Sequence, residues 1–186
     1  MPLPFMETLL ATRLPFVEDP GLRASAPSTS VKLPGVQGLR VDLLAPGEPL
    51  GSVVRVPELR WCAQAIPHFD YLLEDPEPAA MLAGGHCVPV RLPQAARLVW
   101  HKLYASTQRT GFPEKAAKDR HQALVLGAAL MESDPGALER AFAQTPAAMI
   151  RPVCPLHRAL LEKCGAHEAL GRLLADYLSP DRHACD

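Results

Sequence analysis

The distribution of proline constrains the fold of this chain more than any other feature of its sequence. Twenty of the 186 residues are proline, about twice the average usage of ~5%. Most of them lie before residue 93 or between residues 146 and 155. Proline breaks a helix interior and cannot donate a hydrogen bond to a central strand. We therefore expect a first half of short, interrupted strands and a helical second half.

Composition and charge place the chain among ordinary globular proteins. With 48% hydrophobic and 21% charged residues, it has the composition of one globular domain. A formal charge of -1 excludes an overall field that recruits nucleic acid or an anionic membrane. The chain has no apolar run near the roughly 18 residues that a membrane span needs, and it starts without signal-peptide features. Five cysteines, an odd number, are expected to be reduced thiols in a cytoplasmic protein.

Turn residues and apolar alternation predict several strands in the first half. Two strands joined by a Pro-Gly turn at residues 34–35 predict a hairpin, and Gly84-Gly85 joins another pair. Pro89 restricts the second strand of that pair to an edge. Residues 57–73 fit neither pattern clearly. The predicted strands cover residues 29–33, 38–45, 52–56, 81–83 and 86–92.

Helical periodicity takes over after Pro93. Ala95, Leu98, Val99 and Leu103 fall on one face of the first predicted helix. Lys102 lies beside that face, where an ammonium group needs an anion or an exposed position. The predicted helices cover residues 93–106, 114–132, 135–142, 155–164 and 167–178.

Asp42 is the first candidate functional residue. It lies in an otherwise apolar strand, and the two-residue period places it on the same face as Arg40. One interpretation is an Arg/Asp pair on the exposed face of the strand. The other is a metal-binding or catalytic carboxylate.

Cations gather in the second half of the chain, between residues 102 and 120. Lys115 shares a helix face with Lys118 and with Asp119, and Arg109 lies in the preceding loop. Charges at this spacing form either a solvated face or a cluster that binds phosphate.

A third pattern, Cys154-x-x-His157 followed by Cys164-x-x-His167, has the spacing of two zinc half-sites. The apolar residues between the two half-sites favour ordinary helix packing as the first interpretation. A zinc-stabilised helical module is the lower-ranked alternative.

The order of these segments resembles a known family. Val41-Asp-Leu-Leu-Ala-Pro46 is followed by a segment at residues 63–73, by Pro89 to Leu103 with its His101-Lys-Leu, and by Lys115-Ala-Ala-Lys-Asp119 with Gln122. This order is similar to the downstream part of a bacterial nucleotidyltransferase-fold family in the DNA polymerase β-like superfamily. The resemblance covers residues 39–138.

The resemblance implies an α+β fold. A small mixed β-sheet, a partial nucleotidyltransferase fold at residues 1–92, is followed by a helical C-terminal region at residues 93–186, and the two form one structural unit. The implied activity is Mg²⁺-dependent transfer of a nucleoside monophosphate from an NTP to an unknown acceptor. Asp42 matches the third carboxylate of the family, a catalytic metal ligand. The nucleotide-binding positions implied are Lys102, Arg109, Lys115, Lys118 and Asp119.

The chain also departs from the family pattern. The superfamily places a Gly-Gly or Gly-Ser turn and an Asp-x-Asp pair before the Asp42 strand, and residues 1–41 contain neither. Because one carboxylate cannot hold two metal ions, we expect a truncated or degenerate member. The alternative is a non-catalytic interaction module or antitoxin-like partner, which binds another protein or a second copy of itself.

Overall fold

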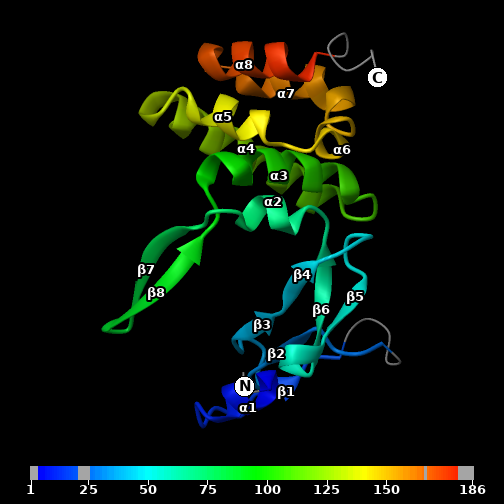
Figure 1. Ribbon diagram of the computed structural model, residues 1–186, viewed down its shortest axis with the longest axis vertical. Coiled ribbons are helices and arrows are strands. Elements are labelled where there is room, and N and C mark those ends of the chain that lie inside the picture. The colour runs from blue at the N-terminus through cyan, green and yellow to red at the C-terminus, as the bar shows by residue number, and fades with distance from the viewer. Residues whose placement is uncertain (1–3, 21–25, 166, 180–186) are drawn as a thin grey trace. The chain divides into compact units, whose positions relative to one another are not determined.

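The computed structural model describes residues 4–20, 26–165 and 167–179. Contacts within the chain form two compact units, Met1–Phe69 and Asp70–Asp186. Short strands dominate the first unit and helices the second (Figure 1), which confirms the α+β class. The division predicted from sequence, into a sheet region at residues 1–92 and a helical region at residues 93–186, stays a prediction.

The described part of the first unit contains the short helix α1, a 3₁₀ helix at Pro57–Leu59 and two small sheets. One sheet has the order β1-β2-β3 and is antiparallel. The other has the order β4-β6-β5, with β4 parallel and β5 antiparallel to β6. The elements are α1 (Phe5–Leu10), β1 (Val17–Glu18), β2 (Ser30–Lys32), β3 (Arg40–Asp42), β4 (Leu44–Pro46), β5 (Val53–Val56) and β6 (Trp61–Ile66).

The predicted hairpin forms between β2 and β3. Gly35 adopts a φ of 108° in the connecting turn, a conformation that favours glycine. The second predicted strand, at residues 38–45, is however split at Leu43. The Leu43 amide donates to the Thr29 carbonyl, whereas its own carbonyl accepts from the Gln64 amide. The chain therefore passes from one sheet to the other at this residue.

Residues 57–73, which the sequence pattern left ambiguous, contain β6 and the helix α2 (Phe69–Leu73). Ala63 and Ala65 are fully buried on one face of β6. β6 lies between β4 and β5 and is the central strand of its sheet.

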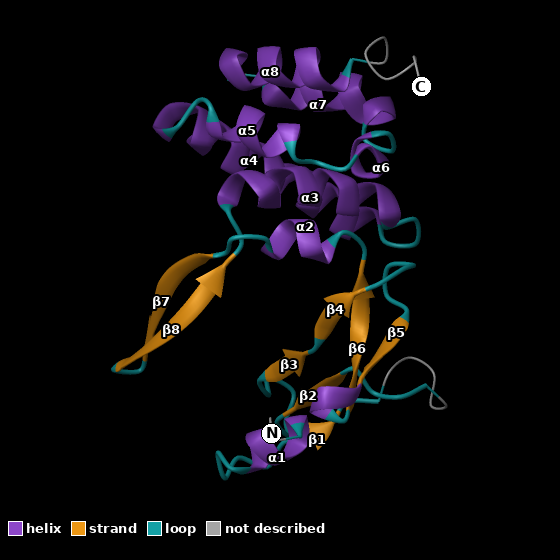
Figure 2. Cartoon of the chain, in the orientation of Figure 1, coloured by secondary structure: helices purple, strands orange, loops and turns teal. Residues whose placement is uncertain are grey.

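The second unit consists of helices and one two-stranded ribbon (Figure 2). Helices form within all five predicted helical segments, since proline falls at their ends. The elements that follow α2 are β7 (Glu77–Ala83), β8 (His86–Leu92), α3 (Ala95–Gln108), α4 (Pro113–Ser133), α5 (Ala137–Ala143), α6 (Ala147–Ile150), α7 (His157–Cys164) and α8 (Glu168–Leu178). No helix in the described ranges is long and apolar enough to cross a membrane.

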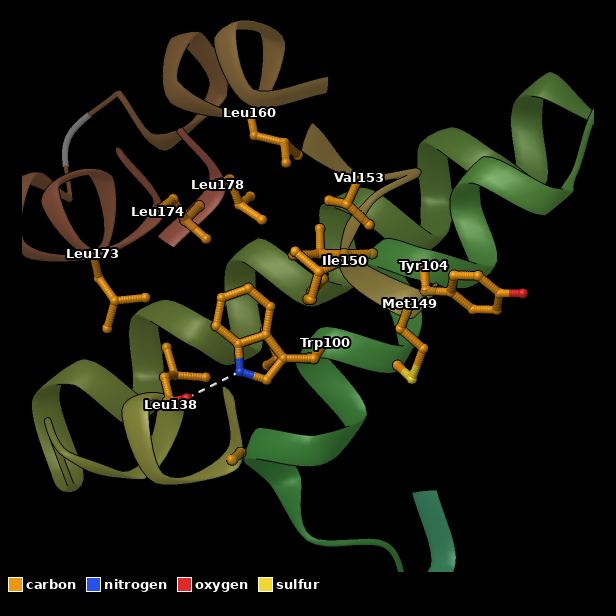
Figure 3. Packing of buried hydrophobic residues seen from close by; sticks show 14 of the residues in the cluster. Trp100, Tyr104, Leu138, Met149, Ile150, Val153, Leu160, Leu173, Leu174 and Leu178 are labelled. Atoms are coloured by element: carbon orange, nitrogen blue, oxygen red, sulfur yellow. Dashed lines mark hydrogen bonds between the residues drawn. The ribbon is translucent and has the colours of Figure 1, made fainter. Parts of the chain in front are cut away.

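Trp100 lies in the hydrophobic core of the second unit (Figure 3). Its side chain is fully buried, and its indole Nε1 donates to the Leu138 carbonyl at 3.0 Å. On α4, a Cβ atom at Gly127 would lie 3.2 Å from Leu170 Cδ1. Glycine at this position therefore lets α8 pack closely against α4.

The buried face of α3 differs slightly from the prediction. Val99 and Leu103 are buried as expected, but Ala95 and Leu98 are only half-buried. Arg97 is buried instead, at 2% exposure. Its guanidinium donates to the Tyr71 carbonyl at 2.8 Å and to Glu74 Oε2 at 2.7 Å. These contacts join the start of α3 to α2 and the loop after it.

Candidate functional site

Asp42 is the last residue of β3, and its carboxylate contacts Arg40 on the same face of the strand. Arg40 Nε lies 2.8 Å from Asp42 Oδ1. The β2–β3 register places Ser30 opposite Asp42 and Lys32 opposite Arg40. The co-facial Arg40/Asp42 pair predicted from the two-residue period is confirmed, and both side chains are about half exposed.

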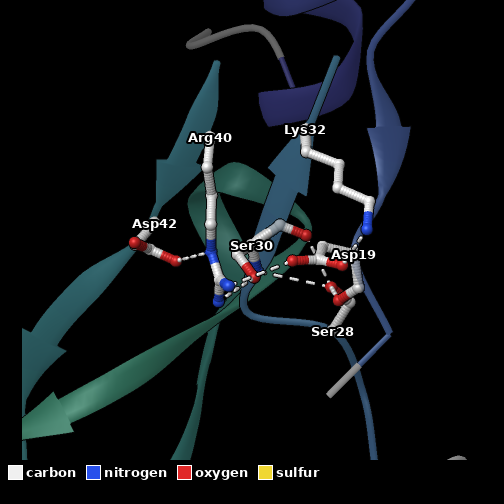
Figure 4. A network of polar contacts seen from close by, with 6 residues as sticks. All are labelled: Asp19, Ser28, Ser30, Lys32, Arg40 and Asp42. Carbon is white, nitrogen blue, oxygen red and sulfur yellow. Dashed lines mark hydrogen bonds and ion pairs between the residues drawn. The ribbon is translucent and has the colours of Figure 1, made fainter. Parts of the chain in front are cut away.

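A second carboxylate joins this group from the loop that follows β1. Asp19 Oδ2 lies 3.1 Å from Arg40 Nη1, and Asp19 Oδ1 lies 2.8 Å from Lys32 Nζ. The Arg40 guanidinium therefore lies between two carboxylates (Figure 4). Arg40 Nη2 also donates to the Ser30 hydroxyl at 3.1 Å. Asp19 was not among the residues predicted from sequence, because only strand pairing brings it to Arg40.

The donor set of this group does not fit the Mg²⁺ ion that the family resemblance implies. Magnesium requires several oxygen ligands in near-octahedral geometry. Here the two carboxylates already pair with two cations, Lys32 and Arg40, so their charges are compensated within the protein. No group of three or more His, Cys, Asp or Glu side chains in the described ranges could hold a metal ion. We therefore derive no catalytic step through a metal at Asp42.

Asp19 titrates differently from an isolated carboxylate. The Lys32 hydrogen bond and the Lys32 and Arg40 charges lower its pKa below the ordinary value of 3.8, although desolvation acts in the opposite direction. Since the folded-state pKa is the lower one, the stabilisation is present above about pH 3.8 and is lost as the pH falls through the folded-state value.

We expect Lys32→Met to return the pKa of Asp19 toward its ordinary value, because the largest cause of the shift is removed. A titration followed by the ¹³C chemical shift of the carboxyl carbon measures this directly. Lys163→Met, at an exposed position in the second unit, is the matched control and leaves the Asp19 curve unchanged. Superimposable Asp19 curves for the wild type and Lys32→Met would contradict the assigned cause.

The second group of candidates lies where α3 and α4 pack together. Asp119 is buried at 8% exposure on α4. Lys102 Nζ, from α3, lies 3.2 Å from Asp119 Oδ1, and Arg109 Nε lies 2.5 Å from Asp119 Oδ2. Lys102 also donates to Gln122 Oε1 at 2.8 Å. Four polar residues of the segments that carry the family resemblance thus meet at one place, which we call the Asp119 cluster: Lys102, Arg109, Asp119 and Gln122.

The remaining two candidates, Lys115 and Lys118, lie outside the Asp119 cluster. Lys115 Nζ lies 4.9 Å from the centroid of the Phe112 ring. Lys118 is exposed. Both occupy the first two turns of α4, whose N-terminus has no side-chain cap. Their charges therefore add to the positive end of the α4 dipole.

Two of the four residues with zinc-like spacing make other contacts. The Cys154 thiol contacts the Ile150 carbonyl, and His167 accepts a hydrogen bond from the Leu170 amide at the start of α8. Burial raises the pKa of the Cys154 and Cys164 thiols, which disfavours the thiolate that zinc requires. The described residues form no metal-binding group, so the zinc-stabilised module is not supported.

Comparison with known families identifies the relationship that these positions suggest. A family model described as nucleotidyltransferase matches residues 1–147. The chain belongs to this nucleotidyltransferase family. No curated protein and no solved structure matches it. The match includes the Asp42 strand and the Asp119 cluster, so both candidate groups lie in the part of the chain shared with the nucleotidyltransferase family.

Proposed function

We propose that this nucleotidyltransferase-family protein binds the triphosphate of an NTP at the Asp119 cluster and the adjoining start of α4. The proposal rests on one observation: two cations share the single carboxylate of Asp119. One positive charge therefore remains uncompensated at the cluster. A phosphate group is the ligand that such a surplus favours.

The surroundings of the cluster increase this positive charge. Lys115, Lys118 and Arg120 lie within the first two turns of α4, and the acidic residues in that stretch are Glu114 and Asp119 itself. Lys102 and Arg109 keep side-chain exposures of 24% and 30%. Their charged ends can therefore reach a ligand in solvent while Asp119 holds them in position.

The parent reaction of the family is transfer of a nucleoside monophosphate from an NTP to an acceptor. In that reaction Mg²⁺ neutralises phosphate charge and lowers the pKa of the attacking hydroxyl. The described residues of this chain compensate Asp42 with Arg40 instead. We therefore propose that the chain is a degenerate member that binds NTP and does not catalyse the transfer by itself.

Calorimetric titration with ATP, GTP, CTP and UTP, each with magnesium, tests the binding. We expect weak binding, with a Kd of about 1 mM. Lys118→Ala removes an exposed cation from the start of α4 and should weaken binding by about threefold to tenfold. Lys163→Ala, an exposed lysine on α7, is the control and should leave Kd unchanged.

Two outcomes would contradict the proposal. Equal NTP affinities for the wild type, Lys118→Ala and Lys102→Ala would show that α3 and α4 do not form the phosphate site. A loss of affinity in Asp42→Ala that appears only with magnesium would show that Asp42 holds the metal after all, and the transfer activity would then have to be assayed in this chain.

The second candidate, an interaction module, is favoured by the exposed apolar ribbon of β7 and β8. The two candidates are compatible, since the ribbon and the Asp119 cluster share no residue.

A further inference from the structure

A polar pocket of about 320 Å³ lies in the second unit. It is formed by the start of α3, the end of α4, helix α5 and the loop that leads from α2 into β7. The pocket shares no lining residue with the Asp119 cluster or with the Arg40/Asp42 pair. Its lining side chains include Asp75, Glu77, Arg97, Asp134, Arg140 and Gln144.

Arg97 contributes a buried donor to this pocket. Its Nη1 donates to the Tyr71 carbonyl and to Glu74, and its Nη2 donates to Gln144 Oε1 at 2.5 Å. The remaining donor, Nε, is buried and has no hydrogen-bond partner among the described residues. A buried N–H group without an acceptor is costly, so most such groups are paired. A ligand that supplies an acceptor to Nε would remove this cost.

The shape of the Arg97 guanidinium places its Nε–H on the pocket side. The group is planar, and Nε–H and one N–H of Nη2 point outward from the same edge. Gln144 accepts at this edge and also lines the pocket. Because Gln144 is exposed, its side chain can turn away and open the edge. A carboxylate fits there better than a single amide oxygen, since its two oxygens accept from both N–H groups at once.

Two acidic residues of the pocket keep uncompensated charges. The two arginines of the pocket each already pair with one carboxylate, Glu74 or Asp134. Asp75 and Glu77 pair with no cation in the described ranges. Gln94 Nε2 donates to the Asp75 carbonyl at 3.1 Å, which holds this residue beside the start of α3. The pocket therefore has a surplus of negative charge, which favours an ammonium group.

These requirements exclude simpler ligands. A phosphate or another simple anion would meet the uncompensated carboxylates of Asp75 and Glu77. A simple cation would leave the Arg97 Nε–H without an acceptor. The described residues offer no group of three or more His, Cys, Asp or Glu side chains that could hold a metal ion. A ligand with both a carboxylate and an ammonium group satisfies the two requirements together.

An ion pair makes another wall of the pocket polar. The Arg140 guanidinium turns back to the Asp134 carboxylate. A Cβ atom at Gly136 would lie 2.6 Å from Arg140 Nη1, so glycine at this position leaves room for the pair. An apolar group placed against this wall would desolvate the two charges, which is unfavourable. The wall therefore favours a ligand with a polar side chain.

We propose that this pocket binds a free α-amino acid with a small polar side chain. The carboxylate of the ligand replaces Gln144 Oε1 and accepts from Nε and Nη2 of Arg97. The ammonium group of the ligand contacts Asp75 and Glu77. An α-amino acid has both charged groups on one carbon atom, so a pocket of about 320 Å³ accommodates it. The site does not depend on NTP binding at the Asp119 cluster.

A ¹H–¹⁵N NMR titration of the full chain with L-serine tests the proposal. The Arg97 Nε–H signal should move downfield as it gains an acceptor, with a Kd of about 1 mM. Two derivatives serve as matched probes, since N-acetyl-L-serine lacks the ammonium group and L-serinamide lacks the carboxylate. Each derivative should bind at least about tenfold more weakly than L-serine.

Variants of the pocket test the two halves of the site. Asp75→Asn and Glu77→Gln should each raise the Kd for L-serine at least about threefold, because each removes a partner of the ammonium group. Asparagine tolerates the φ of 49° at residue 75. Gln144→Ala removes the competing acceptor and should lower the Kd about twofold to threefold. Glu139→Gln, at an exposed position of α5 that does not line the pocket, is the matched control and should leave the Kd unchanged.

Three results would each overturn the proposal. The first is an Arg97 Nε–H signal that does not move when L-serine reaches about ten times the expected Kd. The second is equal affinity for L-serine and either derivative. The third is a Kd for both Asp75→Asn and Glu77→Gln that equals the Kd of Glu139→Gln. Circular dichroism checks that each variant is folded, which is expected because all four substituted residues are exposed.

Discussion

Trp100→Ala should lower the free energy of unfolding of the helical unit by about 3 to 5 kcal/mol. The Trp100 side chain is fully buried, and its ring lies 5.0 Å from the Phe142 ring in an edge-on arrangement. Truncation removes this packing and leaves a cavity between α3 and α5. It also leaves the Leu138 carbonyl without the indole donor at 3.0 Å, an additional cost for a buried polar group.

Urea unfolding followed by far-ultraviolet circular dichroism measures this loss, because helices make up most of the second unit. Val125→Ala, on the exposed side of α4 at 56% exposure, is the control and should change stability by less than about 0.5 kcal/mol. A Trp100→Ala variant within about 1 kcal/mol of the wild type would show that Trp100 is not central to the core.

Asp119→Ala should have the second-largest effect, a loss of about 2 to 3 kcal/mol. The substitution leaves Lys102 and Arg109 close together without the carboxylate that both contact. Partial exposure of the two cations, at 24% and 30%, reduces the cost below that of a fully buried pair.

A double-mutant cycle separates this interaction from the rest of the site. Lys102→Ala introduced into Asp119→Ala should cost less than Lys102→Ala in the wild type, with a coupling energy of about 1 kcal/mol. Asp134→Ala is the control, since the Asp134 carboxylate is 52% exposed and pairs with exposed Arg140; it should cost less than about 1 kcal/mol. Additive effects of the Asp119 and Lys102 substitutions would contradict the shared ion pair.

The helical half was the most predictable part of the fold. Most of its helices start near prolines and show a 3.6-residue period, both of which are local signals. The hairpin at Pro34-Gly35 and the turn at Gly84-Gly85 were predictable for the same reason, since positive φ values favour glycine. Strand β6 was not, because its residues carry no clear alternation and its central position depends on β4 and β5.

The candidate sites were predictable only in part. The two-residue period was enough to pair Arg40 with Asp42, and the position of Lys102 beside an apolar face indicated that it needed an anion. The sequence pattern also placed Lys115 and Asp119 on one face of α4, but it did not predict that the Lys115 ammonium lies over the Phe112 ring. Because the lysine side chain is long and flexible, helix periodicity does not predict which of several neighbours its ammonium group contacts.

The sequence by itself determined the division into a strand-rich start and a helical end, together with the family relationship, because both depend on the order and spacing of residues. Only the tertiary structure decided what the charged residues do. Strand pairing brings Asp19 to Arg40, so that the carboxylates are compensated without a metal ion. Helix packing makes Asp119 the shared partner of Lys102 and Arg109. The reason is physical. Charged groups interact strongly only within a few ångströms, and local sequence patterns do not indicate which distant segments the fold brings that close.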